Sequence, residues 1–176
     1  ACTALGVHAW AHPGDLGRAA DAAALFERAD REFGGLDIFV GNHGVWPPED
    51  VPIAEMTDAQ WHDTVSANLH SIFYTCREAA GRLRDDGRMV LVSSTAGQRG
   101  EANHADYAAT KGAMISLVKG LCVELAPRGI TVNAVAPGWI DTEMAAGALQ
   151  GAEGERIAAA IPIGRVASAE IGRAHV

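Results

Sequence analysis

The stretch RMVLVSSTAG, residues 88–97, carries two signals that decide the fold. Its first part is a nearly continuous run of β-forming apolar residues, which is typical of a strand buried on both faces of a parallel sheet. Its second part is polar and contains a glycine, as expected for a turn that follows such a strand. The stretch therefore predicts a parallel strand whose carboxyl end opens onto a ligand site.

Three other runs of the same kind lie at Val7–Ala11, Leu36–Val40 and Ile130–Val135. The intervals between the four runs have helical spacing of apolar residues, which predicts right-handed βαβ units and a doubly wound parallel α/β sheet. A (β/α)₈ barrel would need a longer chain. The expected helices are Asp21–Phe33, a second from Asp58 to Leu83 with Thr57 or Asp58 as N-cap, and a third from about Tyr107 to Ala126 that Pro127, Arg128 and Gly129 end.

Composition limits the classes of function. The chain has 176 residues, 48% of them hydrophobic, and a formal net charge of −8, which fits one globular domain and disfavours a nucleic-acid surface. Three cysteines, Cys2, Cys76 and Cys122, lack the spacing of a disulfide framework or a zinc site, so the default location is a reducing cytoplasm. We expect no metal site, no secretory leader and no membrane-spanning segment.

Each predicted strand is followed by a polar segment that contains glycine. In an open α/β sheet, ligands bind beyond the carboxyl ends of the strands, and glycine lets the backbone approach a ligand closely. Ordinary turn formation explains any one of these segments taken alone. The four segments are His12–Leu16, Gly41–Gly44, Ser93–Gly97 and Pro137–Thr142.

Tyr107 and Lys111 lie four residues apart at the start of the third helix, so their side chains share one helix face. An ammonium within a few ångströms lowers the pKa of a phenol, which predicts an acid/base pair, with a solvated surface pair as the alternative. Ser94, at the tip of the third strand, is either a substrate-binding hydroxyl or a turn serine. Asn68 lies within a helix and needs a partner, either backbone or water near Lys111. No spacing suggests a Ser-His-Asp triad, which disfavours a hydrolase.

Four motifs, taken in order, resemble those of the short-chain dehydrogenase/reductase family. They are GNHG at Gly41, SS…G from Ser93 to Gly97, YAATK at Tyr107 and VNAVAPGWIDT at Val132. The resemblance runs from about Val7 to Ala167 and is nearest to the branch that includes the 3-oxoacyl-acyl-carrier-protein reductases. It implies a Rossmann-like doubly wound parallel sheet that is incomplete at both ends of this chain.

The resemblance also implies roles for particular residues. Tyr107 would protonate the carbonyl oxygen, Lys111 would lower its pKa and hold the nicotinamide ribose, Ser94 would orient the carbonyl, and Asn68 would hold a water. His43 replaces a small residue of the family and is expected to narrow or polarise the site. The expected cofactor is NADP or NAD, since the region that would decide between them is not in this sequence. Its implied contacts are Asp15, Leu16, Asn42, Gly44, Tyr107, Lys111, Pro137, Gly138, Ile140 and Thr142.

By the same resemblance, the substrate is a small-molecule or carrier-protein-bound carbonyl compound, first a 3-oxoacyl thioester, and the full-length parent is a homo-tetramer. Alternatives are a broad-specificity alcohol or sugar dehydrogenase, or a non-catalytic fragment. Arg128 is a candidate contact for an acidic carrier protein or a plain surface residue. Substrate choice is expected to depend on Gln98–Asp106, Trp46, Trp139 and Glu143–Ile161.

The sequence departs from the family at both ends. The glycine-rich Thr-Gly-x-x-x-Gly-x-Gly turn is not in it, and neither are the last strand and helix. We therefore expect residues 1–169 to be part of a domain and to be inactive alone. Residues 170–176, EIGRAHV, back-translate to a sequence that resembles a common sequencing adapter, so we expect a non-native tail; a real helix start cut short is the alternative.

Overall fold

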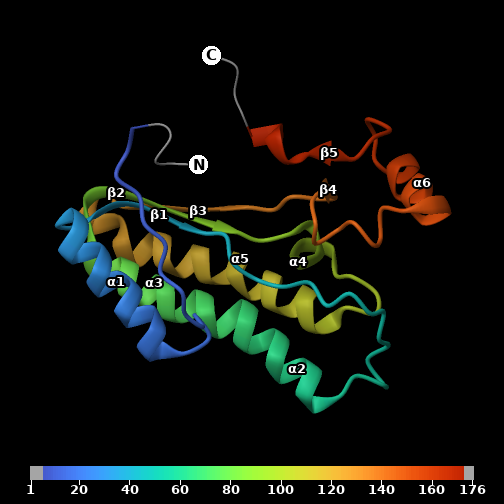
Figure 1. Cartoon of the computed structure of the whole chain (residues 1–176), viewed down its shortest axis with the longest axis horizontal. Coiled ribbons are helices and arrows are strands. Elements are labelled where there is room, and N and C mark those ends of the chain that lie inside the picture. The colour runs from blue at the N-terminus through green and yellow to red at the C-terminus, as the bar shows by residue number, and fades with distance from the viewer. Residues whose placement is uncertain (1–5, 173–176) are drawn as a thin grey trace.

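The central feature of the fold is a three-stranded parallel sheet in the order β1-β2-β3 (Figure 1). The structure, a computed structural model, describes residues 6–172. Phe39 lies opposite Met89, and Met89 lies opposite Val132, so the apolar positions of the three strands are in register. The parallel α/β prediction is therefore confirmed. The strands are β1 (Leu36–Gly41), β2 (Leu83–Val92) and β3 (Thr131–Val135).

Helices connect the strands in the expected places. The predicted second helix is one continuous rod that contains a π-helical turn, Ser66–His70, at its middle. The other elements are α1 (Ala19–Phe33), α2 (Asp58–Val65), α3 (Ser71–Arg82), α4 (Thr95–Arg99), α5 (Ala105–Leu125), β4 (Ile140–Asp141), α6 (Gly151–Ala160) and β5 (Ala167–Ser168), with short 3₁₀ turns at Ala126–Arg128 and Ala169–Gly172.

Side-chain and glycine signals set the helix ends, as predicted. The Thr57 hydroxyl accepts a hydrogen bond of 3.1 Å from the backbone N–H of Gln60 and caps α2. Gly129 follows the 3₁₀ turn after α5 with a φ of 67°, a left-handed conformation that glycine adopts without strain. The chain then enters β3 directly.

The hydrophobic core lies between the sheet and one layer of helices. Ile72, Met89, Leu91 and Met114 are fully buried there. Figure 1 shows α1, α3 and α5 gathered on one face of the sheet. On the other face, Ile38 and Val40 of β1 stay exposed, by 62% and 55%. Within residues 6–172 the strands are thus buried on one face only, whereas their sequence predicted burial on both.

The prediction of a strand at Val7–Ala11 is wrong, because this segment forms no backbone ladder in the described part of the chain. Side-chain contacts hold it against α1 instead. The Trp10 ring stacks on Phe33 at 5.9 Å, and the Arg28 guanidinium lies 4.4 Å from the centre of the Trp10 ring and donates to the Ala11 carbonyl. A β-rich apolar run becomes a strand only where a partner strand accepts its hydrogen bonds.

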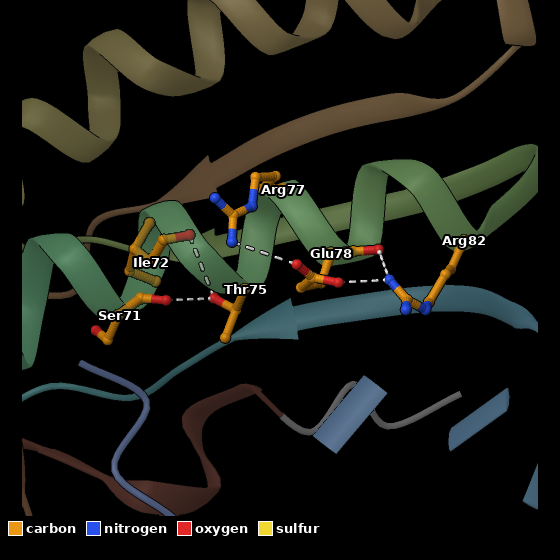
Figure 2. A network of polar contacts seen from close by, with 6 residues as sticks. All are labelled: Ser71, Ile72, Thr75, Arg77, Glu78 and Arg82. Atoms are coloured by element: carbon orange, nitrogen blue, oxygen red, sulfur yellow. Dashed lines mark hydrogen bonds and ion pairs between the residues drawn. The ribbon is translucent and has the colours of Figure 1, made fainter. Parts of the chain in front are cut away.

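A polar network runs along α3 (Figure 2). The Thr75 hydroxyl donates to the Ser71 carbonyl at 2.7 Å, which satisfies a buried polar group within the helix. Near the end of α3, the Arg82 guanidinium pairs with Glu78 at 2.6 Å and with Asp30 of α1 at 2.7 Å. Through Asp30 this network joins the C-terminal end of α3 to α1. The π-helical turn lies at the opposite, N-terminal end of α3.

The C-terminal part of the described chain forms a small unit that the sequence did not predict. Strands β4 and β5 pair in parallel through Ile140 with Ala167 and Asp141 with Ser168. Most of the predicted non-native tail, residues 170–176, lies outside what the structure describes. Among the described helices, none is both long and apolar enough to span a bilayer.

Gly97→Ala should destabilise the fold, because a Cβ at this position would lie 2.5 Å from the carbonyl carbon of Lys111 in α5. Backbone atoms must then move, which costs about 2 kcal/mol or more of the free energy of unfolding. Gly81→Ala is the control, since a Cβ there meets no atom within 4 Å and alanine favours the helix. Urea denaturation of both variants measures the difference; equal stability would contradict the close contact.

Candidate active site

A cavity of about 580 Å³ opens at the carboxyl edge of the sheet. Segments that follow β1, β2 and β3 line it, together with the first turns of α5, as the rule for open α/β sheets predicts. Most of the residues that the sequence predicted for the catalytic and cofactor sites line this cavity. Those that line the cavity are Asn42, Gly44, Ser94, Tyr107, Lys111, Pro137, Gly138, Ile140 and Thr142.

Two reciprocal hydrogen bonds join the end of β2 to α5 beneath this cavity. The buried Ser93 hydroxyl donates to the Lys111 carbonyl at 2.7 Å, and the Lys111 ammonium donates to the Val92 carbonyl at 2.9 Å. Gly97 and Gly112 have no side chains to separate α4 from α5 at this point. The Tyr107 and Lys111 side chains are thereby held beside Ser94.

Lys111 is buried with only 6% of its surface exposed, and within the described residues it forms no ion pair. Burial disfavours the charged amine and lowers the pKa of Lys111 from 10.5 to about 8. Its ammonium nitrogen lies 5.8 Å from the centre of the Tyr107 ring. The two residues are therefore neighbours inside the protein, and the alternative of a solvated surface pair is excluded.

The pKa of Tyr107 is raised, which is the opposite of the direction that the sequence predicted. Burial is the largest cause; a hydrogen bond with the Ser94 side chain lowers the pKa, and the charge of Glu101 raises it further. The Lys111 ammonium donates its hydrogen bond to the Val92 carbonyl, and burial sets the direction of the Tyr107 pKa. Tyr107 is thus held in its protonated form, as a donor.

Ser94 has one of the two roles that its sequence position left open, that of a turn serine. Its hydroxyl accepts a hydrogen bond of 3.1 Å from the Ala96 backbone and caps α4, as a turn serine does. It also lines the cavity together with Tyr107 and acts to lower the pKa of the Tyr107 phenol. The two hydroxyls therefore meet in the cavity, where a carbonyl oxygen can accept from both.

Asn68 is fully buried on the π-helical turn, behind the cavity. Its carboxamide oxygen accepts from the Val45 N–H at 2.6 Å, and its amide donates to the Val45 carbonyl at 2.8 Å. The same amide reaches the Thr110 hydroxyl of α5 at 3.4 Å. The backbone partner that the sequence allowed is therefore found. Asn68 fixes the loop that follows β1 against α5.

Gly44 and His43 shape the cavity beside Lys111. A Cβ on Gly44, whose φ is 147°, would lie 2.9 Å from the Asn68 carboxamide oxygen and 3.4 Å from the Lys111 ammonium. His43 lines the same cavity, and burial lowers its pKa, with the Lys111 charge as a smaller cause in the same direction. Its Nε2 atom is buried without a hydrogen-bond partner among the described residues. The lowered pKa keeps this imidazole in its neutral form at the wall of the cavity.

Asp15 and Leu16 do not line the cavity. The Asp15 backbone N–H donates to the Asp21 carboxylate at 2.9 Å, and the Asp15 carboxylate accepts from the Gly17 N–H at 2.9 Å. These local bonds organise the turn before α1. Arg128 has partners within the fold: its guanidinium donates to the Ala80 and Leu83 carbonyls and pairs with the Asp85 carboxylate. That arrangement favours its structural interpretation over a docking role.

One wall of the cavity was not foreseen from the sequence. Trp46 stacks on the buried His104 ring at 4.6 Å and meets Trp139 edge-on at 5.9 Å, and Glu101 lines the same cavity. Trp46, Trp139 and the segment that contains Glu101 were expected near the substrate, but their mutual contact was not. No local pattern in the sequence links Trp46, His104 and Trp139, because they lie far apart along the chain.

A second missed feature is the buried Asp106 carboxylate, one residue before Tyr107. It accepts from the Tyr107 N–H at 2.8 Å, from the Thr64 hydroxyl at 2.8 Å and from the Gln60 amide at 3.3 Å. It therefore joins α2 to the start of α5 and fixes the backbone that carries Tyr107. No cluster of three or more potential metal ligands occurs in residues 6–172.

Comparisons with known proteins give consistent matches over most of the chain. The family profile described as "Enoyl-(Acyl carrier protein) reductase" matches residues 1–176. The 3-oxoacyl-[acyl-carrier-protein] reductase FabG of Escherichia coli (strain K12) is 36% identical over 153 residues, 86% of this chain and 62% of that protein. The acetoacetyl-CoA reductase of Rhizobium meliloti (strain 1021) is 37% identical over 145 residues, 81% of this chain and 59% of that protein.

Solved structures give the same result. A short-chain dehydrogenase/reductase from Brucella melitensis, described as a glucose/ribitol dehydrogenase, has a TM-score of 0.82 and 38% identity over 88% of this chain and 62% of its own. A short chain dehydrogenase from Burkholderia cenocepacia J2315, in complex with NADP, has a TM-score of 0.87 and 32% identity over 96% of this chain and 67% of its own. The chain thus spans less than two thirds of the length of its curated relatives.

Lys111 should titrate at about pH 8, because burial removes water from its ammonium. The chain has only two lysines, so ¹³C labelling of lysine gives two NMR signals to follow against pH. Loss of one signal in Lys111→Met identifies it. A Lys111 midpoint near the ordinary lysine value of 10.5 would contradict the burial of the amine in solution.

Proposed function

The chain belongs to the short-chain dehydrogenase/reductase family, and on that premise we propose that it carries the catalytic part of an NAD(P)-dependent oxidoreductase that reduces a carbonyl to a hydroxyl. The observation that carries the proposal is the meeting of the Tyr107 and Ser94 hydroxyls in one cavity, with Lys111 buried at its base. A protonated phenol beside a second hydroxyl suits the delivery of a proton to a carbonyl oxygen.

The residues around the cavity fit the nicotinamide end of such a cofactor. Gly44 lies where a Cβ would close the approach to Lys111, so the backbone leaves room for a ligand beside the ammonium. We propose that Lys111 and Tyr107 contact the ribose, with Asn42 and Gly44 beside it. Pro137, Gly138, Ile140 and Thr142 would hold the nicotinamide and its carboxamide. When bound, the cofactor supplies the hydride.

In the proposed reaction, Ser94 holds the carbonyl oxygen and Tyr107 donates its proton to that oxygen as hydride arrives at the carbon. Burial of Tyr107 keeps the proton on the phenol at neutral pH, which is the form that reduction of a carbonyl requires. The Lys111 ammonium stabilises the phenolate that remains after the transfer. Asn68 positions Gly44 and Val45 through its carboxamide, and a role for Asn68 in holding a relay water stays a prediction.

The proposed substrate is a 3-oxoacyl thioester, because curated relatives that match most of the chain are reductases of that class. A second candidate, oxidation or reduction of a sugar or alcohol, is favoured by the similarity to the glucose/ribitol dehydrogenase structure from Brucella melitensis. Steady-state rates of the full-length protein with acetoacetyl thioesters and with polyols would decide between them.

Tyr107→Phe should reduce kcat of the full-length protein by about 10²–10⁴-fold, since the variant keeps the ring but loses the proton donor. Steady-state kinetics with a fixed carbonyl substrate measure the loss. Tyr74→Phe is the matched control, because Tyr74 lies on α3, away from the cavity, against His70, Phe73 and Arg77. Near-normal turnover of Tyr107→Phe would remove Tyr107 from the mechanism.

The 176-residue chain by itself should bind NAD(H) and NADP(H) with a Kd weaker than about 1 mM and should show no turnover. Its sequence contains no glycine-rich turn of the kind that holds a pyrophosphate at a helix N-terminus, and Asp15 and Leu16 lie outside the cavity. Isothermal titration of soluble chain with each dinucleotide measures the affinity. A micromolar Kd would show that the described cavity suffices for binding.

A further inference from the structure

Two tryptophans that line the cavity, Trp46 and Trp139, meet at nearly a right angle. Their ring centres are 5.9 Å apart, and the planes of the two rings make an angle of 84°. Trp46 also stacks on the His104 ring, at 4.6 Å and an interplanar angle of 15°. His104 is 1% exposed and does not line the cavity, so its ring supports the buried side of Trp46. The two indoles present an aromatic corner to the cavity.

Hydrogen bonds on both sides of Trp46 hold its backbone in place. Asn68 accepts from the Val45 N–H at 2.6 Å and donates to the Val45 carbonyl at 2.8 Å. The His104 Nε2 atom donates to the Pro47 carbonyl at 2.9 Å. Because Val45 and Pro47 flank Trp46 in the chain, the indole is positioned before any ligand arrives. Such preorganisation reduces the entropy that binding costs.

The backbone around Trp139 is held in a similar way. The Pro137 carbonyl accepts from the Thr95 N–H at 2.9 Å, which joins this segment to the start of α4. On the other side, Ile140 begins β4 and pairs with Ala167 of β5. Both walls of the aromatic corner therefore have a fixed backbone on either side of the indole.

The aromatic corner belongs to the same cavity as the proposed proton donor. His104 directly precedes α5 and lies three residues before Tyr107, about one helical turn. The ring that supports Trp46 is thus attached to the first turn of the helix that carries Tyr107. A substituent of the reacting carbonyl is the part of the substrate that reaches the aromatic corner.

A flat aromatic ring matches this corner better than a saturated ring of the same size. It can lie with its face against one indole and its edge toward the other, and both arrangements are favoured between aromatic rings. A saturated ring is thicker and gains only the burial of its surface. This contact needs no charge on the ligand; the lining holds two cations, Lys111 and Arg99, as well as the Glu101 carboxylate.

We propose that Trp46 and Trp139 are specificity-determining residues that bind an aromatic ring next to the reacting carbonyl. The inference rests on the proposed function for the identity of the reacting group. It narrows the substrate class to aryl carbonyl compounds, such as aryl ketones and 3-oxo-3-aryl thioesters.

The test compares acetophenone with cyclohexyl methyl ketone, two neutral ketones with equal numbers of carbon atoms that differ in the flatness of the ring. Their affinities for the full-length protein are measured by saturation-transfer NMR with excess NADP⁺, which has no hydride to give, so the result does not depend on turnover. Burial alone favours the saturated ring, because it has the larger apolar surface. We expect the native protein to bind acetophenone about fivefold more tightly.

Trp46→Leu and Trp139→Leu keep an apolar side chain but remove one aromatic wall, and each should bring the two affinities within about twofold. Trp46→Phe keeps a ring that can stack on His104 and should keep the preference for acetophenone. Trp61→Leu is the matched control, because Trp61 is 38% exposed on α2 and does not line the cavity. It should leave the preference unchanged.

Far-UV circular dichroism identifies the variants that fold, and Trp139→Leu carries the test if Trp46→Leu does not fold. The inference is overturned if the native protein binds the two ketones equally, prefers the saturated ring or binds neither. It is also overturned if a folded leucine variant at either position of the aromatic corner keeps the native preference. Absence of NAD(P)H-dependent turnover would instead count against the proposed function, and would leave the binding ratio as measured.

Discussion

The reciprocal hydrogen bonds between the end of β2 and the first turns of α5 are the constraint on which the rest of the site depends. Ser93 donates to the Lys111 carbonyl while the Lys111 ammonium donates to the Val92 carbonyl, so a strand end and a helix face hold each other at two points. Gly97 lets the backbones approach, because any side chain there would overlap Lys111. This contact sets the distance between Ser94 and Tyr107, and hence the chemistry of the cavity.

Buried polar groups around this contact are satisfied almost entirely by uncharged partners. Asn68 bonds to Val45 and Thr110, and Asp106 bonds to Thr64, Gln60 and the Tyr107 backbone. The bonds of Thr64 and Gln60 to Asp106 and of Asn68 to Thr110 join the neighbouring helices to the start of α5, and the bonds of Asn68 to Val45 hold the loop after β1. A shift of one element would therefore leave several buried donors or acceptors without partners at once. Such networks favour one arrangement over its near neighbours, which suits a site that must position two hydroxyls.

Electrostatics in the cavity follow from burial more than from charge pairing. Desolvation raises the pKa of Tyr107 and lowers those of Lys111 and His43, so each is shifted toward its neutral form. The Tyr107 phenol therefore keeps its proton at neutral pH, and the Lys111 ammonium begins to lose its charge around pH 8.

Local patterns in the sequence were sufficient for the helices α1 and α5, for the strands β1, β2 and β3, and for the residues that meet in the cavity. Those features depend on side-chain periodicity and on capping and turn residues, which act over a few neighbouring positions. Val7–Ala11 has the composition of a strand, yet it is not one here, because strand formation requires hydrogen bonds to a partner distant in sequence. The exposure of Ile38 and Val40 could not be predicted either, because it depends on which elements cover each face of the sheet. Only the tertiary structure decided the direction of the Tyr107 pKa, the exclusion of Asp15 from the cavity and the stack of Trp46 on His104, because burial and through-space contact are set by how distant segments pack.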